Sequence, residues 1–161
     1  MTWDAYNRRK PVLREVLALA DRRRDELTVD DVFTAVPEAR EVFDDATDLL
    51  LDVQLMWFQR LNGQMELQLT EGDDTSEMTA ITAWIRAAEA MPGARALLDA
   101  NAHRPELTKA FGLERAFLAE ASGVPGQQIV DAARDAALAA PAEADDRPLG
   151  FIGRLRGALA A

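Results

Sequence analysis

The chain of 161 residues contains no cysteine and a single histidine. Without cysteine it can form neither a disulfide framework nor a zinc–thiolate site, and this composition fits a reducing cytosol. One histidine, His103, is too few for most zinc sites and for hemerythrin-type centres, which need several imidazoles. A Glu-x-x-His pair of the kind found in di-iron helical bundles is also missing. We therefore expect no metal and no cofactor.

Long apolar runs are lacking too. No stretch approaches the roughly 18 apolar residues that a membrane-spanning helix needs. The opening residues also lack the basic-then-apolar layout of a secretory signal. We expect a soluble, cytoplasmic chain without a transmembrane segment.

Common catalytic signatures are missing as well. The sequence has no Walker A loop, no G-x-G-x-x-G and no G-x-S-x-G. His103 stands in the polar stretch DANAHRPEL just before Pro105, which favours an exposed turn over a catalytic position. We predict that the chain is not an enzyme.

Acidic residues, by contrast, are abundant, with 28 Asp and Glu against 18 Lys and Arg and a formal net charge of −10. Such a surface repels the phosphate backbone that supplies most non-specific affinity for DNA. Cations nevertheless prevail in residues 1–24 and 147–161, so two basic ends flank an acidic body. We interpret the acidic runs DDATD (44–48) and EGDD (71–74) as solvated charges near helix starts rather than carboxylate metal sites.

Helical periodicity dominates the rest of the sequence. Apolar residues recur three and four positions apart, and no long alternating β-branched segment appears. The longest stripe comprises Val42, Ala46, Leu49, Leu50, Val53, Trp57, Leu61 and Met65. A later stripe consists of Leu107, Phe111, Glu114 and Leu118, which also follow one another at helical spacing. The pattern predicts an all-α bundle of five to seven helices.

Several residues predict where these helices begin and end. Thr28 is suited to be an N-cap, with Asp31 three residues on in place of the usual Glu of a capping box. Thr75 or its neighbour Asp74 is suited to cap a later helix. We expect Pro37 to begin the helix that contains the long stripe, and Pro11 to kink the first helix or begin a second one.

Four large side chains are the candidates for a ligand pocket: Trp57, Phe58, Met65 and Trp84. Their helical spacing on apolar faces is typical of core packing. The alternative is an apolar pocket between helices that binds a hydrophobic small molecule.

Composition divides the chain into three parts. Residues 1–139 form the helical domain, in which we separate a helix-turn-helix-like region (1–50) from ligand- and dimer-like helices (51–139). Residues 140–148, APAEADDRP, have the composition of a flexible linker. Residues 149–161 form an amphipathic tail peptide.

Three motifs in the first fifty residues occur in an order that resembles the N-terminal region of TetR-family regulators. RRKPVLREVLAL (8–19) is similar to the family's first helix and TVDDV (28–32) to the capped start of its second. FDDATDLL (43–50) is similar to the start of its linking helix, except that Ala46 stands where the family has Lys. Residues 84–123 look like the helical ligand and dimer domain of actinobacterial members.

This resemblance implies a TetR-like bundle, a homodimer formed through the C-terminal helices and a role in transcription regulation. It also implies which residues would touch DNA if that contact is retained, namely Arg8, Arg9, Lys10, Thr28 and Arg40.

One segment departs from the family pattern. Only FTAVPEAREV (33–42) separates Val32 from Phe43, whereas the family has a longer segment there with a Gly turn and a basic recognition helix. A recognition helix must present several donors to base edges in the major groove, yet Arg40 is the only cation in this segment and acids surround it. We expect specific DNA binding to be weakened or lost.

The tail carries a second resemblance. IGRLRG (152–157) is similar to the I-G-x-L-K-G core of encapsulin cargo-loading peptides, which also follow a flexible Pro/Ala-rich linker. It implies a protein-interaction module addressed to a larger assembly, with Leu149, Phe151, Ile152, Leu155 and Arg156 docking on the partner. The body, however, lacks the metal ligands of most known cargo. A weak anionic-lipid anchor, or a tail packed on its own body or on a dimer partner, stays open.

Overall fold

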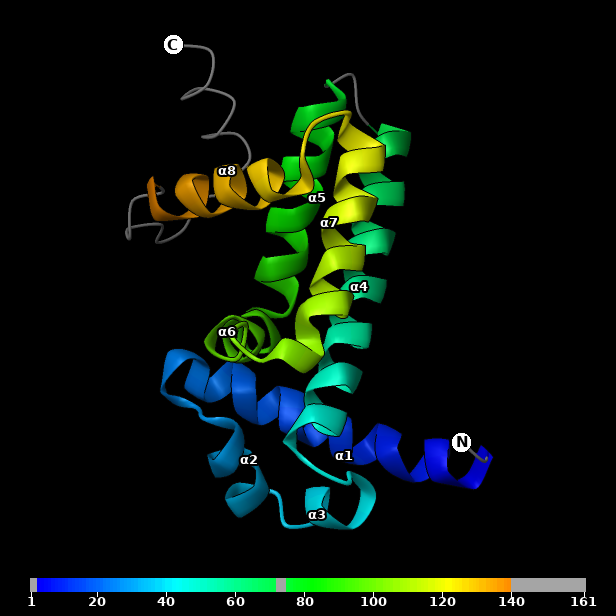
Figure 1. Cartoon of the computed structure of the whole chain (residues 1–161), viewed down its shortest axis with the longest axis vertical. Helices are drawn as coiled ribbons and strands as arrows, with labels where there is room; N and C mark the ends of the chain where they lie inside the picture. Colours follow the sequence, from blue (N-terminus) through cyan, green and yellow to red (C-terminus); the bar gives the residue numbers. More distant parts are fainter. Residues whose placement is uncertain (1–2, 72–74, 140–161) are drawn as a thin grey trace.

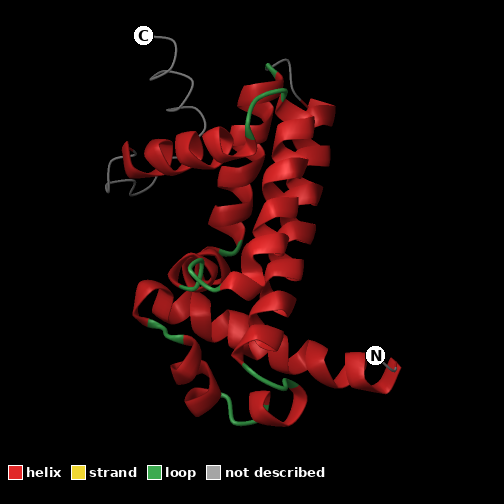
Figure 2. Ribbon diagram, viewed as in Figure 1, coloured by secondary structure: helices red, strands yellow, loops and turns green. Residues whose placement is uncertain are grey.

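The computed structural model describes residues 3–71 and 75–139, and these residues form helices joined by short turns (Figures 1 and 2). No strand occurs in these two ranges, which confirms the predicted all-α class. None of the helices in this part of the chain is both long and apolar enough to cross a membrane. The predicted linker and the tail-docking residues lie outside the described residues.

Eight α-helices and two 3₁₀ turns make up the described ranges. In chain order they are α1 (Trp3–Arg23), η1 (Arg24–Glu26), α2 (Val29–Ala35), α3 (Ala39–Val42), α4 (Ala46–Glu71), α5 (Ser76–Ala90), α6 (Pro92–Ala100), η2 (Pro105–Leu107), α7 (Thr108–Ser122) and α8 (Gly126–Ala139).

The count exceeds the predicted five to seven helices because the long stripe is interrupted. Phe43 is extended (φ −112°, ψ 132°) and buried, so it separates the single turn of α3 from α4. The Asp45 side chain then accepts a hydrogen bond from the Asp48 N–H (2.9 Å), which caps the start of α4. The expectation that one helix runs on from Pro37 was therefore wrong.

Proline at position 11 does not divide the first helix. α1 runs through Pro11 as one element, so the expectation that a second helix begins there was wrong. Pro11 and Asn7 are both exposed, and solvent can therefore hydrate the carbonyl that the proline leaves without a donor.

The predicted caps at Thr28 and Thr75 are confirmed. Thr28 and Asp31 form a reciprocal capping box in which the Thr28 Oγ1 accepts from the Asp31 N–H (3.1 Å) and the Asp31 carboxylate accepts from the Thr28 N–H (3.1 Å). The Thr75 hydroxyl accepts from the Met78 N–H (3.3 Å) at the start of α5.

Three long helices form the body of the molecule (Figure 1). α4, α5 and α7 lie alongside one another, and α8 crosses α5 and α7 at one end. At the other end α6 packs on α1, and α2 and α3 lie on the opposite side of α1. The core extends through all of these layers, and the predicted long stripe lies in it from Leu49 to Met65.

Candidate ligand site and DNA-binding candidates

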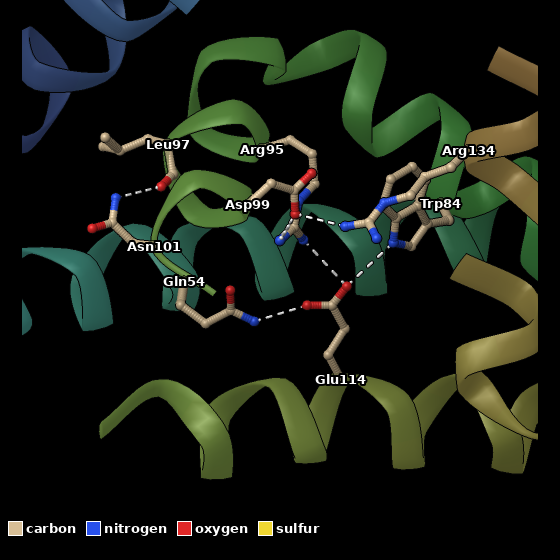
Figure 3. Close-up of polar contacts among 8 residues, drawn as sticks. All are labelled: Gln54, Trp84, Arg95, Leu97, Asp99, Asn101, Glu114 and Arg134. Carbon is tan, nitrogen blue, oxygen red and sulfur yellow. Dashed lines mark hydrogen bonds and ion pairs between the residues drawn. The ribbon is translucent and has the colours of Figure 1, made fainter. Parts of the chain in front are cut away.

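A buried carboxylate, Glu114 on α7, is the centre of a polar network inside the bundle (Figure 3). Its Oε2 accepts a hydrogen bond from the Gln54 Nε2 (2.9 Å), and its Oε1 accepts from the Trp84 Nε1 (3.2 Å) and the Arg95 Nη1 (3.4 Å). The donors come from α4, α5 and α6. Four helices are thus joined at one charged group, which is only 3% exposed.

Asp99 on α6 extends this network toward the surface. It lies 2.7 Å from the Arg95 Nη2 one turn earlier and 2.7 Å from the Arg134 Nη2 on α8. Arg95 therefore bridges a buried carboxylate and a half-buried one, and Arg134 links α8 to the same cluster.

Aromatic rings surround the Arg95 guanidinium. Its central carbon lies 4.7 Å from the Trp57 ring centroid, 5.8 Å from that of Trp84 and 5.6 Å from that of Phe111. The two indoles also meet edge to face, with centroids 5.5 Å apart. Cation–π contacts and the ion pairs together hold the guanidinium in place.

Three of the four predicted ligand-pocket residues lie in the core, and the fourth, Phe58, is half-buried. Trp57, Trp84 and Met65 are buried, and Phe58 packs edge to face on Phe117 with ring centroids 5.3 Å apart. The Trp57 and Trp84 rings contact each other, and the Arg95 guanidinium lies against both. A hydrophobic ligand against these rings stays a prediction that nothing here tests.

A cavity of about 160 Å³ lies beside the network. Residues of α6, α7 and α8 and of the turn after α6 line it: Arg95, Asp99, Ala102, Phe111, Glu114, Arg115, Gln127, Val130 and Arg134. The cavity wall includes three arginines, Arg95, Arg115 and Arg134, and two carboxylates, Asp99 and Glu114. Both carboxylates already form ion pairs. Among the described residues, no ion pair engages Arg115, so the cavity wall carries one uncompensated positive charge.

Three buried polar atoms near Arg95 have no hydrogen-bond partner among the described residues. They are the Gln54 Oε1, the Trp57 Nε1 and the Arg95 Nε. Buried polar atoms without a protein partner are uncommon in folded proteins.

Arg9, a predicted DNA contact, is instead part of an intramolecular ion pair. Its Nη2 lies 2.6 Å and its Nη1 2.9 Å from the two Asp48 carboxylate oxygens, and its Nη1 also lies 3.4 Å from Asp52. The guanidinium covers the Phe43 ring at 5.1 Å. This bidentate contact joins α1 to the start of α4.

The ion pair shifts the pKa values of its members. The hydrogen bond to Asp48 raises the pKa of Arg9. Partial burial acts to raise the pKa of Asp48, but hydrogen bonds from Arg9 and the Asp44 N–H outweigh it, so the pKa lies below its ordinary value. At Asp52 burial prevails over the attraction of Arg9 and raises the pKa.

The remaining DNA-contact candidates are dispersed. Thr28 is occupied in its capping box, and the Arg40 Nε donates to the Phe33 carbonyl (3.3 Å) while its guanidinium lies over the Phe33 ring. Arg8 and Lys10 are exposed on α1. Arg9, Thr28 and Arg40 thus have partners within the molecule, whereas Arg8 and Lys10 are exposed.

Two other sequence features are also located. His103 is exposed in the turn after α6, as predicted. Within the described ranges, no three His, Asp or Glu side chains come close enough together to hold a metal ion. Residues 72–74 of the second acidic run lie outside these ranges.

Comparison of the chain with protein-family models, with curated proteins and with solved structures finds no match. The functional interpretation therefore depends on the residues themselves. Sequence reasoning missed Arg95, Asp99 and Arg134 as site residues. The one available signal was Glu114, a carboxylate at the spacing of the apolar residues of α7.

Proposed function

We propose that this chain is a non-enzymatic, TetR-like binding protein whose DNA-reading element is reduced and whose cavity between α6, α7 and α8 takes a small acidic ligand. Its homodimerisation through the C-terminal helices is part of the proposal. The single observation on which the proposal depends is that α3 is only one helical turn long.

In the family that the sequence resembles, a recognition helix follows the second helix. Here α3, Ala39–Val42, is a single turn. Its only cation, Arg40, is held by the Phe33 carbonyl and ring, and the exposed Glu38 and Glu41 flank it. One turn cannot present several donors along the major groove, and the acids repel phosphates.

The charge of the cavity supports an acidic ligand. The two carboxylates of the cavity wall balance two of its three arginines. A ligand carboxylate near Arg115 would balance the third. Phe111, Ala102 and Val130 offer apolar contact for the rest of the molecule. At about 160 Å³ the cavity is smaller than the pockets of drug-sized ligands, which span about 300–1,000 Å³, so the ligand must be small.

A thermal-unfolding assay of the full chain against a panel of small carboxylic acids tests the ligand. We expect at least one acid to raise the unfolding temperature in a saturable way, since a ligand at about 100 times its Kd stabilises by about 2.7 kcal/mol. Arg115→Gln should abolish this response. The matched control Arg60→Gln, on the exposed face of α4, should retain it. No response from the unaltered chain, or equal loss in both variants, would reject the ligand site.

Fluorescence anisotropy with random duplex DNA tests the reduced reading element. We expect weak binding even at low salt, because the chain has a net charge of −10 and its best-placed arginines are paired within the molecule. Tight, salt-steep binding would support a DNA-binding regulator instead.

The tail motif supports a second candidate function. The IGRLRG sequence favours a protein-interaction module addressed to a larger assembly, such as an encapsulin shell. Co-purification of the full chain with a co-expressed encapsulin shell tests this alternative. Loss of co-purification in an Ile152→Asp, Leu155→Asp variant would favour it, and no co-purification of the unaltered chain would reject it.

A further inference from the structure

A second hollow, which we name the α1/α4 groove, lies on the surface between α1 and α4. It has a volume of about 190 Å³. Nine residues line it: Arg9, Lys10, Leu13, Arg14 and Leu17 from α1, and Asp52, Leu55, Met56 and Gln59 from α4. Figure 1 shows the two helices crossing here, with the N-terminal part of α1 extending beyond α4.

The floor of the groove is apolar and partly open to solvent. Leu55 is 53% exposed, and Leu51 one turn earlier on α4 is 41% exposed. Leu13 and Leu17 provide the opposite wall from α1 at a spacing of one helical turn. Leu51 and Leu55 are the exposed leucines of this face, whereas Leu13 is only 8% exposed and Leu17 is half-buried. Neighbouring exposed leucines are typical of a surface that another molecule covers.

The rim of the groove is cationic on an otherwise acidic protein. Lys10 and Arg14 are exposed four residues apart, so their charged ends form a row parallel to α1. The one acid of the groove, Asp52, shares the charge of Arg9 with Asp48, whereas Lys10 and Arg14 form no ion pair among the described residues. The groove therefore offers two available positive charges beside an apolar strip.

From this arrangement we propose that the α1/α4 groove docks an acidic amphipathic helix of a partner protein. Leucine-like residues of the partner spaced three and four apart would contact Leu13, Leu17 and Leu55. Carboxylates one turn apart on its flank would pair with Lys10 and Arg14. This inference is independent of the ligand cavity, which lies among α6, α7 and α8.

Two other occupants match the groove less well. Duplex DNA would bring phosphates against exposed leucines, and the acids Asp44 and Asp45 lie at the start of the same helix, α4. Residues 147–161 of this chain contain three arginines and no Asp or Glu, so this segment has the same sign of charge as the rim.

The test measures binding of the full chain to a fluorescein-labelled helical peptide with a leucine stripe flanked by glutamates. Lys10→Glu with Arg14→Glu, and separately Leu55→Asp, should each weaken binding at least about tenfold. Two matched controls should bind as the unaltered chain does. One is Arg60→Glu with Lys109→Glu, which changes the net charge equally at exposed sites, and the other is Leu69→Asp, on α4 outside the groove and 62% exposed.

Four results would overturn the proposal. The first is no binding of the peptide by the unaltered chain. The second is equal loss of binding in the groove variants and their controls, which would indicate a general charge effect. The third is displacement of the peptide by random duplex DNA in a manner that depends on Lys10 and Arg14, which would make the groove a DNA surface. Binding that survives when the peptide glutamates are replaced by lysines would also contradict the assigned partner chemistry.

Discussion

At the scale of single residues, the buried Glu114 carboxylate joins four helices of the described fold. It accepts hydrogen bonds from Gln54, Trp84 and Arg95, and each donor belongs to a different helix. Removing one member of a buried charged pair leaves the other charge uncompensated, which costs far more than the pair itself gains.

We therefore predict that Glu114→Ala lowers the free energy of unfolding by about 3 to 5 kcal/mol. Urea denaturation of the full chain measures this loss. Glu120→Ala, at an exposed position of the same helix, is the control and should change stability by less than about 0.5 kcal/mol. Similar losses in the two variants would show that the network does not stabilise the bundle.

The Arg9–Asp48 ion pair leads to a pH-dependent prediction. The pKa of Asp48 is lowered in the folded chain, so its contribution to stability is present above its unfolded pKa and is lost as pH falls through the folded value. Asp48→Asn should cost about 1.5 kcal/mol at neutral pH, the contribution of a charge-assisted hydrogen bond. The difference from the unaltered chain should shrink below about pH 4.

Urea denaturation at several pH values checks this result, with Asp135→Asn as the control because Asp135 is exposed on α8. Asp52, whose pKa is raised, acts in the opposite direction, since the folded chain binds its proton more readily. A difference between Asp48→Asn and the unaltered chain that stays constant down to acidic pH would contradict the role of the ion pair.

At the scale of helices, glycine determines how closely two pairs of elements approach. A Cβ added to Gly93 at the start of α6 would lie 2.0 Å from the Ala20 carbonyl carbon of α1. One added to Gly126 at the start of α8 would lie 1.9 Å from the Arg115 backbone oxygen of α7. Because these glycines have no side chain, α6 packs directly on the backbone of α1, and α8 packs directly on the backbone of α7. This close packing sets the positions of the side chains that line the cavity.

Gly93→Ala should consequently destabilise the chain by about 2 to 3 kcal/mol, because α1 and α6 must move apart. The same change at Gly63, where nothing lies within 4 Å of the added Cβ, should stabilise it by about 0.5 to 1 kcal/mol through helix propensity. Thermal or urea unfolding of the two variants measures the contrast. If Gly93→Ala and Gly63→Ala changed the stability equally, the close approach of α1 and α6 would not be required.

Local chemistry explains which helices could be predicted from the sequence. The Thr28 and Thr75 caps were readable because an N-cap depends on residues three positions apart. The break at Phe43 was missed because Phe43 continues the apolar pattern, although Asp45 stands three residues before Asp48 as Thr28 stands three before Asp31.

At the scale of the whole molecule, the site required the three-dimensional fold. Arg95, Asp99 and Arg134 are ordinary charged residues in their own helices, and their ion pairs, which join them to one another and through Arg95 to Glu114, depend on how α6, α7 and α8 are arranged. Trp57 and Trp84 were correctly singled out as large inward side chains, but no local pattern indicates that they flank a guanidinium. Glu114 stands at the spacing of the apolar residues of α7, but it was not predicted as a site residue.

The proposal that α3 does not recognise a specific DNA sequence is tested most directly by a binding selection. The full chain is incubated with a pool of random duplexes at cellular ionic strength, and the retained duplexes are sequenced after several rounds. We predict that no sequence is enriched over the starting pool, since one acidic turn offers too few donors to base edges. Enrichment of a palindromic sequence whose binding is lost in Arg40→Ala would contradict the claim.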